Sequence, residues 1–216
     1  MVNEEYEALL DRWAEQPHHK RRCFIRDGIL NPELWANAPL HVVFLMREAY
    51  GENPHAENWD LRKYVQNEPP HKGSKLSKTL GYWAHVIFGH PVAPIPSPAQ
   101  ARCTFLHTAQ VNVKKSGGTS RSSMHEIAEF ARVDSALLRD QLSLLSPDIV
   151  VGGNLGECIR IIWPAATRVS ERGWLCDGIP FYDFRWHPAN RYSYERNYKE
   201  FASAWAEYRK FVSRQP

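Results

Sequence analysis

Apolar residues follow two alternating patterns along the chain. Continuous apolar runs are typical of strands buried on both faces, whereas apolar residues spaced three or four apart are typical of amphipathic helices. The continuous runs predict strands at residues 41–46, 104–111, 148–152 and 181–184. The helical spacing predicts helices at about residues 3–15, 75–88, 124–145, 155–162 and 194–213.

The alternation of strands with helices predicts an α/β fold. We expect a three-layer sandwich, in which helices flank both faces of a central four-stranded, mainly parallel sheet. The chain has 216 residues and is 43% hydrophobic, which is enough apolar material for one sizeable core. We therefore expect a single domain over residues 1–216, with residues 1–40 as an N-terminal helical extension.

Polar and glycine-rich segments follow each predicted strand. In open α/β sheets, ligands bind beyond the carboxyl ends of the strands. We therefore expect a carboxylate, an amide, several glycines and an imidazole to meet at one edge of the sheet. The four segments are REAYG (47–51), NVKKSGG (112–118), GGNLG (152–156) and RWHP (185–188).

Two further segments indicate binding surfaces. The polar segment after residue 51 is far longer than a median connection of about four to six residues. It carries Trp59, Leu61 and Tyr64, too many apolar residues for a disordered chain, so we expect a binding surface there. Ser123 and Glu126 form a capping-box pattern, and the backbone amides at that helix start are suited to a phosphate.

Composition and charge narrow the functional classes only slightly. Lys and Arg number 27 against 24 Asp and Glu, which gives a net charge of +3, and a mild excess does not establish a polyanionic partner. The polar N-terminal residues and the lack of a run of about 18 apolar residues predict a soluble, cytoplasmic protein with no membrane partner. The four cysteines are far apart, which predicts buried, reduced thiols.

The segments at the strand ends, in this order, resemble motifs of the uracil-DNA glycosylase superfamily. In that family a Gly-acid/amide-x-Pro-Gly motif follows the first strand and a His-Pro motif follows the last. Here these motifs appear as Arg47-Glu48-Ala49-Tyr50-Gly51 and His187-Pro188-Ala189-Asn190. The segment 112–115 is similar to the Asn-x-x-Lys of the family's iron–sulfur branch, and residues 137–157 are similar to that branch's helix, proline and strand ending in glycine. The resemblance spans about residues 41–213.

The chain departs from the family pattern at three positions. Arg47 replaces the first glycine of the first motif and Tyr50 replaces its proline. Ser116 stands where the iron–sulfur branch has a cluster-ligating cysteine. We therefore expect no iron–sulfur cluster, no other metal and no cofactor.

The resemblance implies hydrolysis of an N-glycosidic bond, with three catalytic residues. Glu48 would position or deprotonate water and stabilise the oxocarbenium-like transition state, and His187 would donate to the departing base. Asn112 would read the hydrogen-bonding edge of the base. Taken singly, each has a simpler interpretation: a solvated loop glutamate, a turn histidine, or an asparagine bonded to a neighbouring turn.

The resemblance and the distribution of charge also imply binding residues. An enzyme that acts on a base inside a duplex flips the nucleotide out and stacks it on aromatic side chains. The expected substrate-binding residues are Arg47, Ala49, Tyr50, Gly51, Trp59, Lys115 and Gly153. The expected DNA-binding residues are Lys72, Lys75, Lys78, Arg121, Pro188, Asn190, Arg191 and Tyr192.

The sequence therefore predicts a monofunctional DNA glycosylase, expected to act as a monomer. Uracil is the default base, and a deaminated purine or a bulky modified pyrimidine of phage DNA is an alternative that would make the protein an antiviral defence factor. A second hypothesis is a non-catalytic DNA-binding sensor of modified bases. A nucleotide-binding enzyme built on residues 152–156 has weaker support, because the full G-x-G-x-x-G is missing. Neither H-E-x-x-H nor G-x-S-x-G occurs, so a metalloprotease or serine hydrolase has less support still.

Overall fold

A computed structural model describes residues 4–20, 22–50, 57–68, 74–118 and 122–212. Within these ranges, no helix has the length and apolar character needed to cross a membrane.

The core of the molecule is a seven-stranded sheet with the order β2-β5-β3-β6-β9-β8-β7. Its four central strands, β5, β3, β6 and β9, pair in parallel, and the pairs outside them are antiparallel. The predicted parallel sheet is therefore present, but as the centre of a larger one rather than as a sheet of four strands. The strands are β2 (Gly28–Ile29), β3 (Val42–Tyr50), β5 (Ala109–Gly118), β6 (Ile149–Gly153), β7 (Thr167–Arg168), β8 (Gly173–Cys176) and β9 (Ile179–Phe184).

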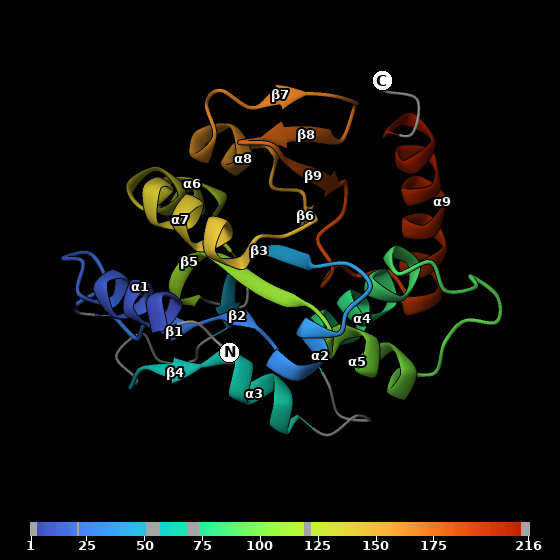
Figure 1. Ribbon diagram of the computed structural model, residues 1–216, viewed down its shortest axis with the longest axis horizontal. Coiled ribbons are helices and arrows are strands. Elements are labelled where there is room, and N and C mark those ends of the chain that lie inside the picture. Colours follow the sequence, from blue (N-terminus) through green and yellow to red (C-terminus); the bar gives the residue numbers. More distant parts are fainter. Residues whose placement is uncertain (1–3, 21, 51–56, 69–73, 119–121, 213–216) are drawn as a thin grey trace.

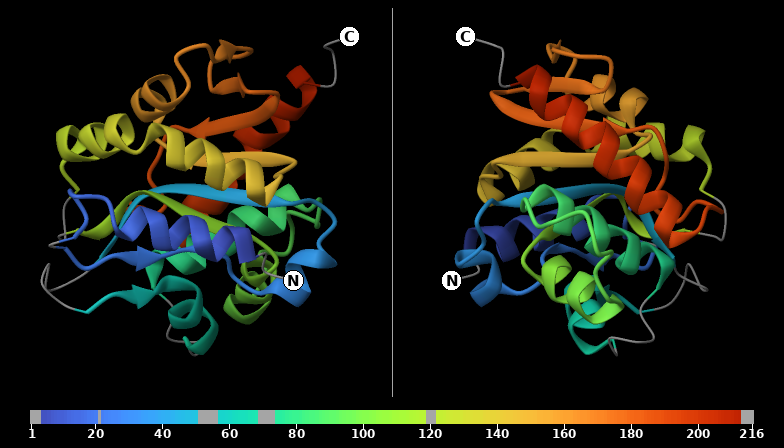
Figure 2. Two further views of the ribbon diagram at one scale, coloured as in Figure 1. Left: turned by 60° about the vertical axis from the view of Figure 1, so that its left-hand side comes forward. Right: turned by 90° about the vertical axis from the view of Figure 1, so that its right-hand side faces the viewer.

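Helices cover both faces of this sheet (Figures 1 and 2). One face packs against α1 (Glu4–Ala14), α2 (Pro32–Ala36), α6 (Met124–Val133), α7 (Ser135–Leu145) and α8 (Gly156–Ile162). The other face packs against α3 (Leu61–Asn67), α4 (Lys75–Ile87), α5 (Pro98–Leu106) and α9 (Tyr194–Val212). The molecule is thus a three-layer α/β structure.

Alternation along β3 shows why these strands read as continuous apolar runs. Val42, Phe44 and Met46 belong to the core on the side of α4 and α9, whereas Val43 and Leu45 belong to the core on the side of α1 and α7. Because successive side chains of a strand point to opposite faces, a strand covered on both faces is apolar at every position.

The segment 104–111 is not the continuous strand that its apolar character predicted. Ser97 and Gln100 form a capping box that starts α5, and this helix continues to Leu106 before β5 begins at Ala109. The predicted helix over 124–145 is also two helices, because the chain turns at Asp134 between α6 and α7.

The antiparallel edge formed by β8 and β9 was missed. Asp177 and Gly178 join these strands, and both have positive φ, 50° and 83°. A two-residue Asp-Gly loop with two positive φ values is the preferred turn of a tight hairpin. This dipeptide was the signal that could have found the edge.

The first forty residues are not only helical. β1 (Ile25–Arg26) pairs in parallel with β4 (Trp59–Asp60), and β2 pairs with β5 at the edge of the main sheet. β4 and α3 also give structure to the described part of the long polar segment after residue 51.

Candidate functional site

The four parallel strands bring their carboxyl ends to the same edge of the sheet. β3 ends at Tyr50, β5 at Gly118, β6 at Gly153 and β9 at Phe184. Arg47 and Glu48 lie in the last residues of β3, and His187 follows β9 by three residues.

The backbone of the His-Pro turn fixes the imidazole of His187. The backbone N–H of Ala189 donates to Nδ1 of His187 at 3.2 Å, and the N–H of Asn190 donates to the His187 carbonyl at 3.0 Å. Because Nδ1 accepts, the proton of the neutral ring is on Nε2. Burial, with the nearby Arg47 charge, lowers the pKa of His187 to about 4. At neutral pH this imidazole is therefore an uncharged Nε2–H donor.

Gly153 allows the end of β6 to pack directly against the His-Pro turn. A Cβ atom at this position would lie 2.8 Å from Cδ of Pro188 and 2.9 Å from the carbonyl oxygen of Trp186. Any side chain at residue 153 would push the turn away from the sheet and move His187 with it.

Arg47 lies beside His187 at the mouth of the site. Burial lowers the pKa of its guanidinium, and the nearby Cys158, Asp183 and Glu48 oppose this by raising it. Within the described ranges its Nε is buried and has no hydrogen-bond partner. A buried guanidinium donor without a partner is costly, so this is a position where a bound acceptor would stabilise the protein.

Asp183 is a site residue that sequence reasoning missed. It is 3% exposed, and its Oδ1 accepts from the backbone N–H of Leu155 at 2.8 Å. Burial raises its pKa, against the opposing effect of the backbone N–H groups at the start of α8. The signal was a lone acidic residue within the apolar run 181–184, since buried acids need partners.

Glu48 is held by a lysine of the neighbouring strand. Lys114 Nζ donates to Glu48 Oε2 at 2.7 Å and also lies 3.1 Å from Glu126 Oε1. The side chains of Glu48 and Lys114 are only 4% and 3% exposed. A Cβ atom on Gly118 would lie 2.0 Å from the Glu48 carboxyl carbon, so only glycine at this position leaves room for the carboxylate.

Asn112 lies one step below this pair on the same face of β5. Asn112 is the register partner of Met46, and Lys114 is the register partner of Glu48. Its Oδ1 accepts from Gln110 at 3.4 Å, whereas its Nδ2 is buried without a partner among the described residues. The structure thus places an unused amide donor on β5 two residues before Lys114, the partner of Glu48.

Lys115, the next residue of β5, is fully buried among other partners. Its Nζ donates to Asp27 Oδ1 at 2.7 Å and to Gln141 Oε1 at 2.7 Å. These partners and the full burial of Lys115 leave none of its donors for a ligand at the sheet edge. We therefore remove Lys115 from the predicted substrate-binding residues.

The other predicted pocket residues have mixed placements. Ala49 is buried in the core. Trp59 is partly buried and meets Tyr64 edge-on, with ring centroids 5.9 Å apart. Gly51 and the side chain of Tyr50 lie outside the described residues.

Several predicted DNA-binding residues gather around the turn that follows the His-Pro step. Lys75 Nζ donates to the Tyr192 carbonyl at 2.8 Å, and the Tyr192 ring lies under the Arg196 guanidinium at 3.7 Å. Arg191 directly precedes Tyr192 and is exposed. Pro188 is buried, Lys78 is partly buried on α4, and Asn190 bonds to Asn197 at 2.7 Å; Lys72 and Arg121 lie outside the described residues.

Glu200 on α9 binds both residues that precede His187, Arg185 and Trp186. Its carboxylate accepts from Trp186 Nε1 at 2.8 Å and from Arg185 at 3.2 Å. Arg196 donates to its other oxygen at 2.7 Å. These bonds attach the strand end to α9, so the residues before His187 support its position.

A cavity of about 370 Å³ adjoins Asp183 and Asn154 at the start of α8. Arg160, Arg168 and Arg172 contribute to its lining. Glu157, Glu171 and Asp183 line it as well, so the lining carries both signs of charge. The volume is within the range of small-molecule sites.

In comparisons with protein families, curated proteins and solved structures, the chain has no significant match.

Proposed function

We propose that this chain is a monofunctional DNA glycosylase, a divergent member of the uracil-DNA glycosylase superfamily. The observation that carries the proposal is the state of His187. It is a neutral imidazole whose Nδ1 accepts a hydrogen bond from the Ala189 N–H. It follows β9 at the edge of the sheet where β3 ends with Arg47 and Glu48 among its last residues.

Cleavage of an N-glycosidic bond leaves negative charge on the departing base. The bond's electron pair goes to the base, whose carbonyl oxygen then takes up much of the charge. A preorganised donor aimed at that oxygen stabilises the transition state more than the ground state. In the proposed mechanism His187 Nε2–H is this donor, and the Arg47 cation beside it favours the anion further.

The sugar carries the complementary positive charge. We propose that the Glu48 carboxylate stabilises the oxocarbenium-like carbon and orients the water that attacks it. The attack forms a C–O bond at the anomeric carbon, and the released proton passes to the carboxylate or to solvent. Lys114 holds Glu48 in place through one oxygen, Oε2.

Asn112 is proposed to read the base. Its Nδ2 is buried and without a partner among the described residues, so an acceptor on a flipped-out base would complete its hydrogen bonding. A base without that acceptor would leave the donor buried and unpaired, which is strongly disfavoured. This arrangement favours a base with a carbonyl oxygen on its recognition edge.

The surface near the site supports contact with a DNA strand. Arg191 is exposed in the turn beyond the His-Pro step, and Lys75 lies next to it through its bond to Tyr192. We propose that Arg191 enters the helix stack while the base is outside. Contacts of Lys75 and Arg191 with DNA phosphates would give binding that weakens as the salt concentration is raised.

The experiment that tests the proposal is mass spectrometry of the bases released from a DNA panel. The panel contains uracil, hypoxanthine, xanthine, 5-hydroxymethylcytosine and glucosylated 5-hydroxymethylcytosine. We expect the wild-type protein to release one free base and Glu48→Gln to release none. No release from any DNA by the wild-type protein would reject the glycosylase.

One observation favours a second candidate function, a non-catalytic sensor of modified bases. Arg47 stands where the family has glycine and carries a buried Nε without a partner among the described residues, so it is also suited to hold a base without cleaving it. A sensor would bind one DNA of the panel tightly and produce no abasic sites. Arg47→Gly would then weaken binding, whereas in an enzyme it would change which base is released.

A further inference from the structure

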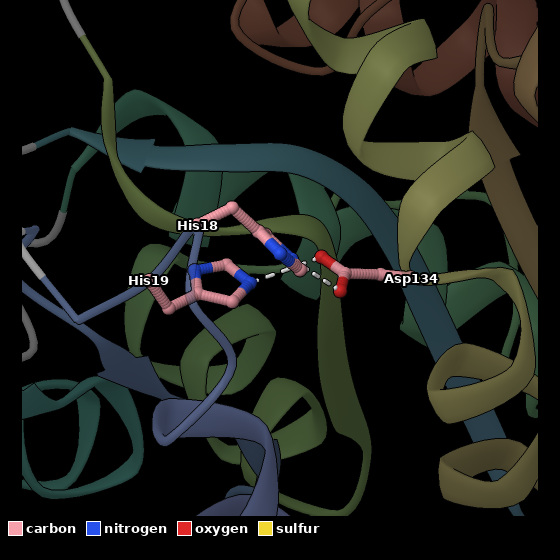
Figure 3. A group of neighbouring side chains, drawn as sticks. All are labelled: His18, His19 and Asp134. Carbon is pink, nitrogen blue, oxygen red and sulfur yellow. Dashed lines mark hydrogen bonds and ion pairs between the residues drawn. The ribbon is translucent and has the colours of Figure 1, made fainter.

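Two histidines and one aspartate meet on the helical face that contains α1, α6 and α7 (Figure 3). His18 Nε2 lies 2.8 Å from Asp134 Oδ1, and His19 Nε2 lies 3.0 Å from Asp134 Oδ2. The ligand atoms of the three side chains all lie within 4.8 Å of one another. The histidines come from the turn after α1, and Asp134 comes from the junction between α6 and α7.

Burial sets this cluster apart from a surface ion pair. The side chains of His19 and Asp134 are 0% exposed, and that of His18 is 33% exposed. Burial of a carboxylate away from water is unfavourable unless the carboxylate has charged or hydrogen-bonding partners. His18 leaves one side of the cluster open to solvent.

Asp134 is also diverted from the role that its position predicts. It lies at the N-cap of α7, where an aspartate normally accepts from the first backbone N–H groups of the helix. No such side-chain bond is present, and both of its oxygens face the histidines instead. The sequence therefore places a carboxylate here for the histidines and not for the helix.

The donor set and its spacing are those of a divalent metal site. Two imidazole nitrogens and one carboxylate are common ligands of Zn²⁺, and an ion with bonds of about 2.0–2.2 Å brings such atoms to roughly 3 Å from one another. For a metal to bind, each Nε2 must present a lone pair, so its proton must move to Nδ1 or leave. Nδ1 of His19 has no hydrogen-bond partner within the described ranges, so this shift breaks no existing bond there.

We propose that His18, His19 and Asp134 form a binding site for Zn²⁺, with water as the fourth ligand on the side where His18 reaches solvent. Phe24 and Phe130 flank His19, with ring centroids 5.4 Å away in each case. These rings surround the inner part of the site with apolar atoms.

The bound ion joins segments that are about 115 residues apart in the chain. It attaches the turn after α1 to the α6–α7 junction, so metal binding adds to the stability of this layer. The site uses none of the proposed glycosylase residues, and either proposal can fail without the other.

The test is calorimetric titration of ZnCl₂ into chelator-stripped protein carrying Cys103→Ser, since Cys103 is an exposed thiol. We expect one ion per chain and, with metal at about 100 times the dissociation constant, a rise in melting temperature on the order of 5 °C. His18→Ala and Asp134→Asn should each weaken binding by at least about 10-fold. His90→Ala removes an exposed histidine of the separate His85–His90 pair and should change nothing.

The substitutions are chosen to leave a folded chain. His18 is partly exposed, and Asp134→Asn keeps the shape of the buried side chain. Co²⁺ titration adds a second readout, because a four-coordinate Co²⁺ site with nitrogen and oxygen ligands has visible absorption that the His18→Ala protein should lack. Equal Zn²⁺ affinity in wild type and in both ligand variants, or no binding to the wild-type protein, would overturn the proposal.

Discussion

Lys114 and Lys115 are neighbours on β5, yet their surroundings are opposite in kind. Lys115 is fully buried, and Asp27 and Gln141 accept its hydrogen bonds. Lys114 contacts Glu48 at the carboxyl edge of the sheet, next to the unpartnered amide of Asn112. One lysine belongs to a closed network, and the other belongs to a group with unused hydrogen-bonding capacity.

The difference teaches how to separate structural charges from functional ones in this molecule. In the Lys115 network, Gln141 also donates to Asp27 at 2.9 Å and to the Tyr6 hydroxyl, which itself donates to the Asp27 carbonyl at 3.0 Å. Nothing there requires a ligand. At the sheet edge, Arg47 Nε and Asn112 Nδ2 are buried without partners among the described residues, and a bound base would supply acceptors.

The largest effect is expected on stability, from Lys115→Met. This change leaves the Asp27 carboxylate buried without its cation, which typically costs about 3–5 kcal/mol. Urea unfolding measures the loss. Lys199→Met removes an exposed partner of Glu195 and should change stability by less than about 0.5 kcal/mol. A loss below about 1 kcal/mol at Lys115 would mean that the closed network is not structural.

The next effect is expected on catalysis, from His187→Ala. Loss of the Nε2–H donor should lower kcat by roughly 10²–10³-fold, as for removal of one oxyanion donor. Single-turnover base release measures this change, and a urea melt should show a stability change much smaller than that of Lys115→Met. If kcat falls less than about threefold, His187 is a turn residue and not the donor.

Gly118→Ala should act on the same site through position alone. The new Cβ would displace the Glu48 carboxylate, and a shift near 1 Å can cost about 10²-fold in rate. Added to Glu48→Gln, the same change should cost little more, because both act through one group. Full and independent losses in the double variant would show that Gly118 acts elsewhere.

The smallest effect is a pH dependence of stability that comes from His187. Its folded-state pKa is about 4, below the ordinary 6.5, so between these values the unfolded chain takes up a proton that the folded chain does not. The free energy of unfolding should fall as pH is lowered from about 6.5 to 4 and should level off below that. Because the ring is partly exposed, the contribution should be on the order of 1–2 kcal/mol.

The control for this pH dependence is His187→Asn. The variant should lose the His187 contribution and keep that of every other group, so the difference between the two urea midpoints should widen from pH 5 to pH 7. A constant difference across this range would contradict a lowered pKa of His187 in the folded protein.

The sequence predicted which residues lie at the strand ends better than it predicted which side chains contact them. Apolar runs and the rule on strand ends brought Arg47, Glu48 and His187 to one edge, because parallel strands share their direction. The expected role of Lys115 came from the Asn-x-x-Lys resemblance, and that motif says nothing of Asp27, the partner that Lys115 has in the structure.

Two of the remaining features depend on long-range contacts that no local pattern contains. Asp27 meets Lys115 across 88 positions, and Asp134 meets His19 across 115 positions. The edge strands β7 and β8 are too short for a hydrophobic period to be visible. Gly118 has an ordinary place in the sequence, and its role appears only when Glu48 is packed against it.

The most direct test of the central claim measures DNA binding and abasic-site formation together for wild type and Glu48→Gln. The panel DNAs are bound under single-turnover conditions, with affinity followed by fluorescence anisotropy and abasic sites counted in the same samples. We predict that both proteins bind one DNA within about twofold of each other, and that only the wild-type protein forms abasic sites. Tight binding with no abasic sites in either protein, or equal numbers of abasic sites in both, would contradict a glycosylase that depends on Glu48.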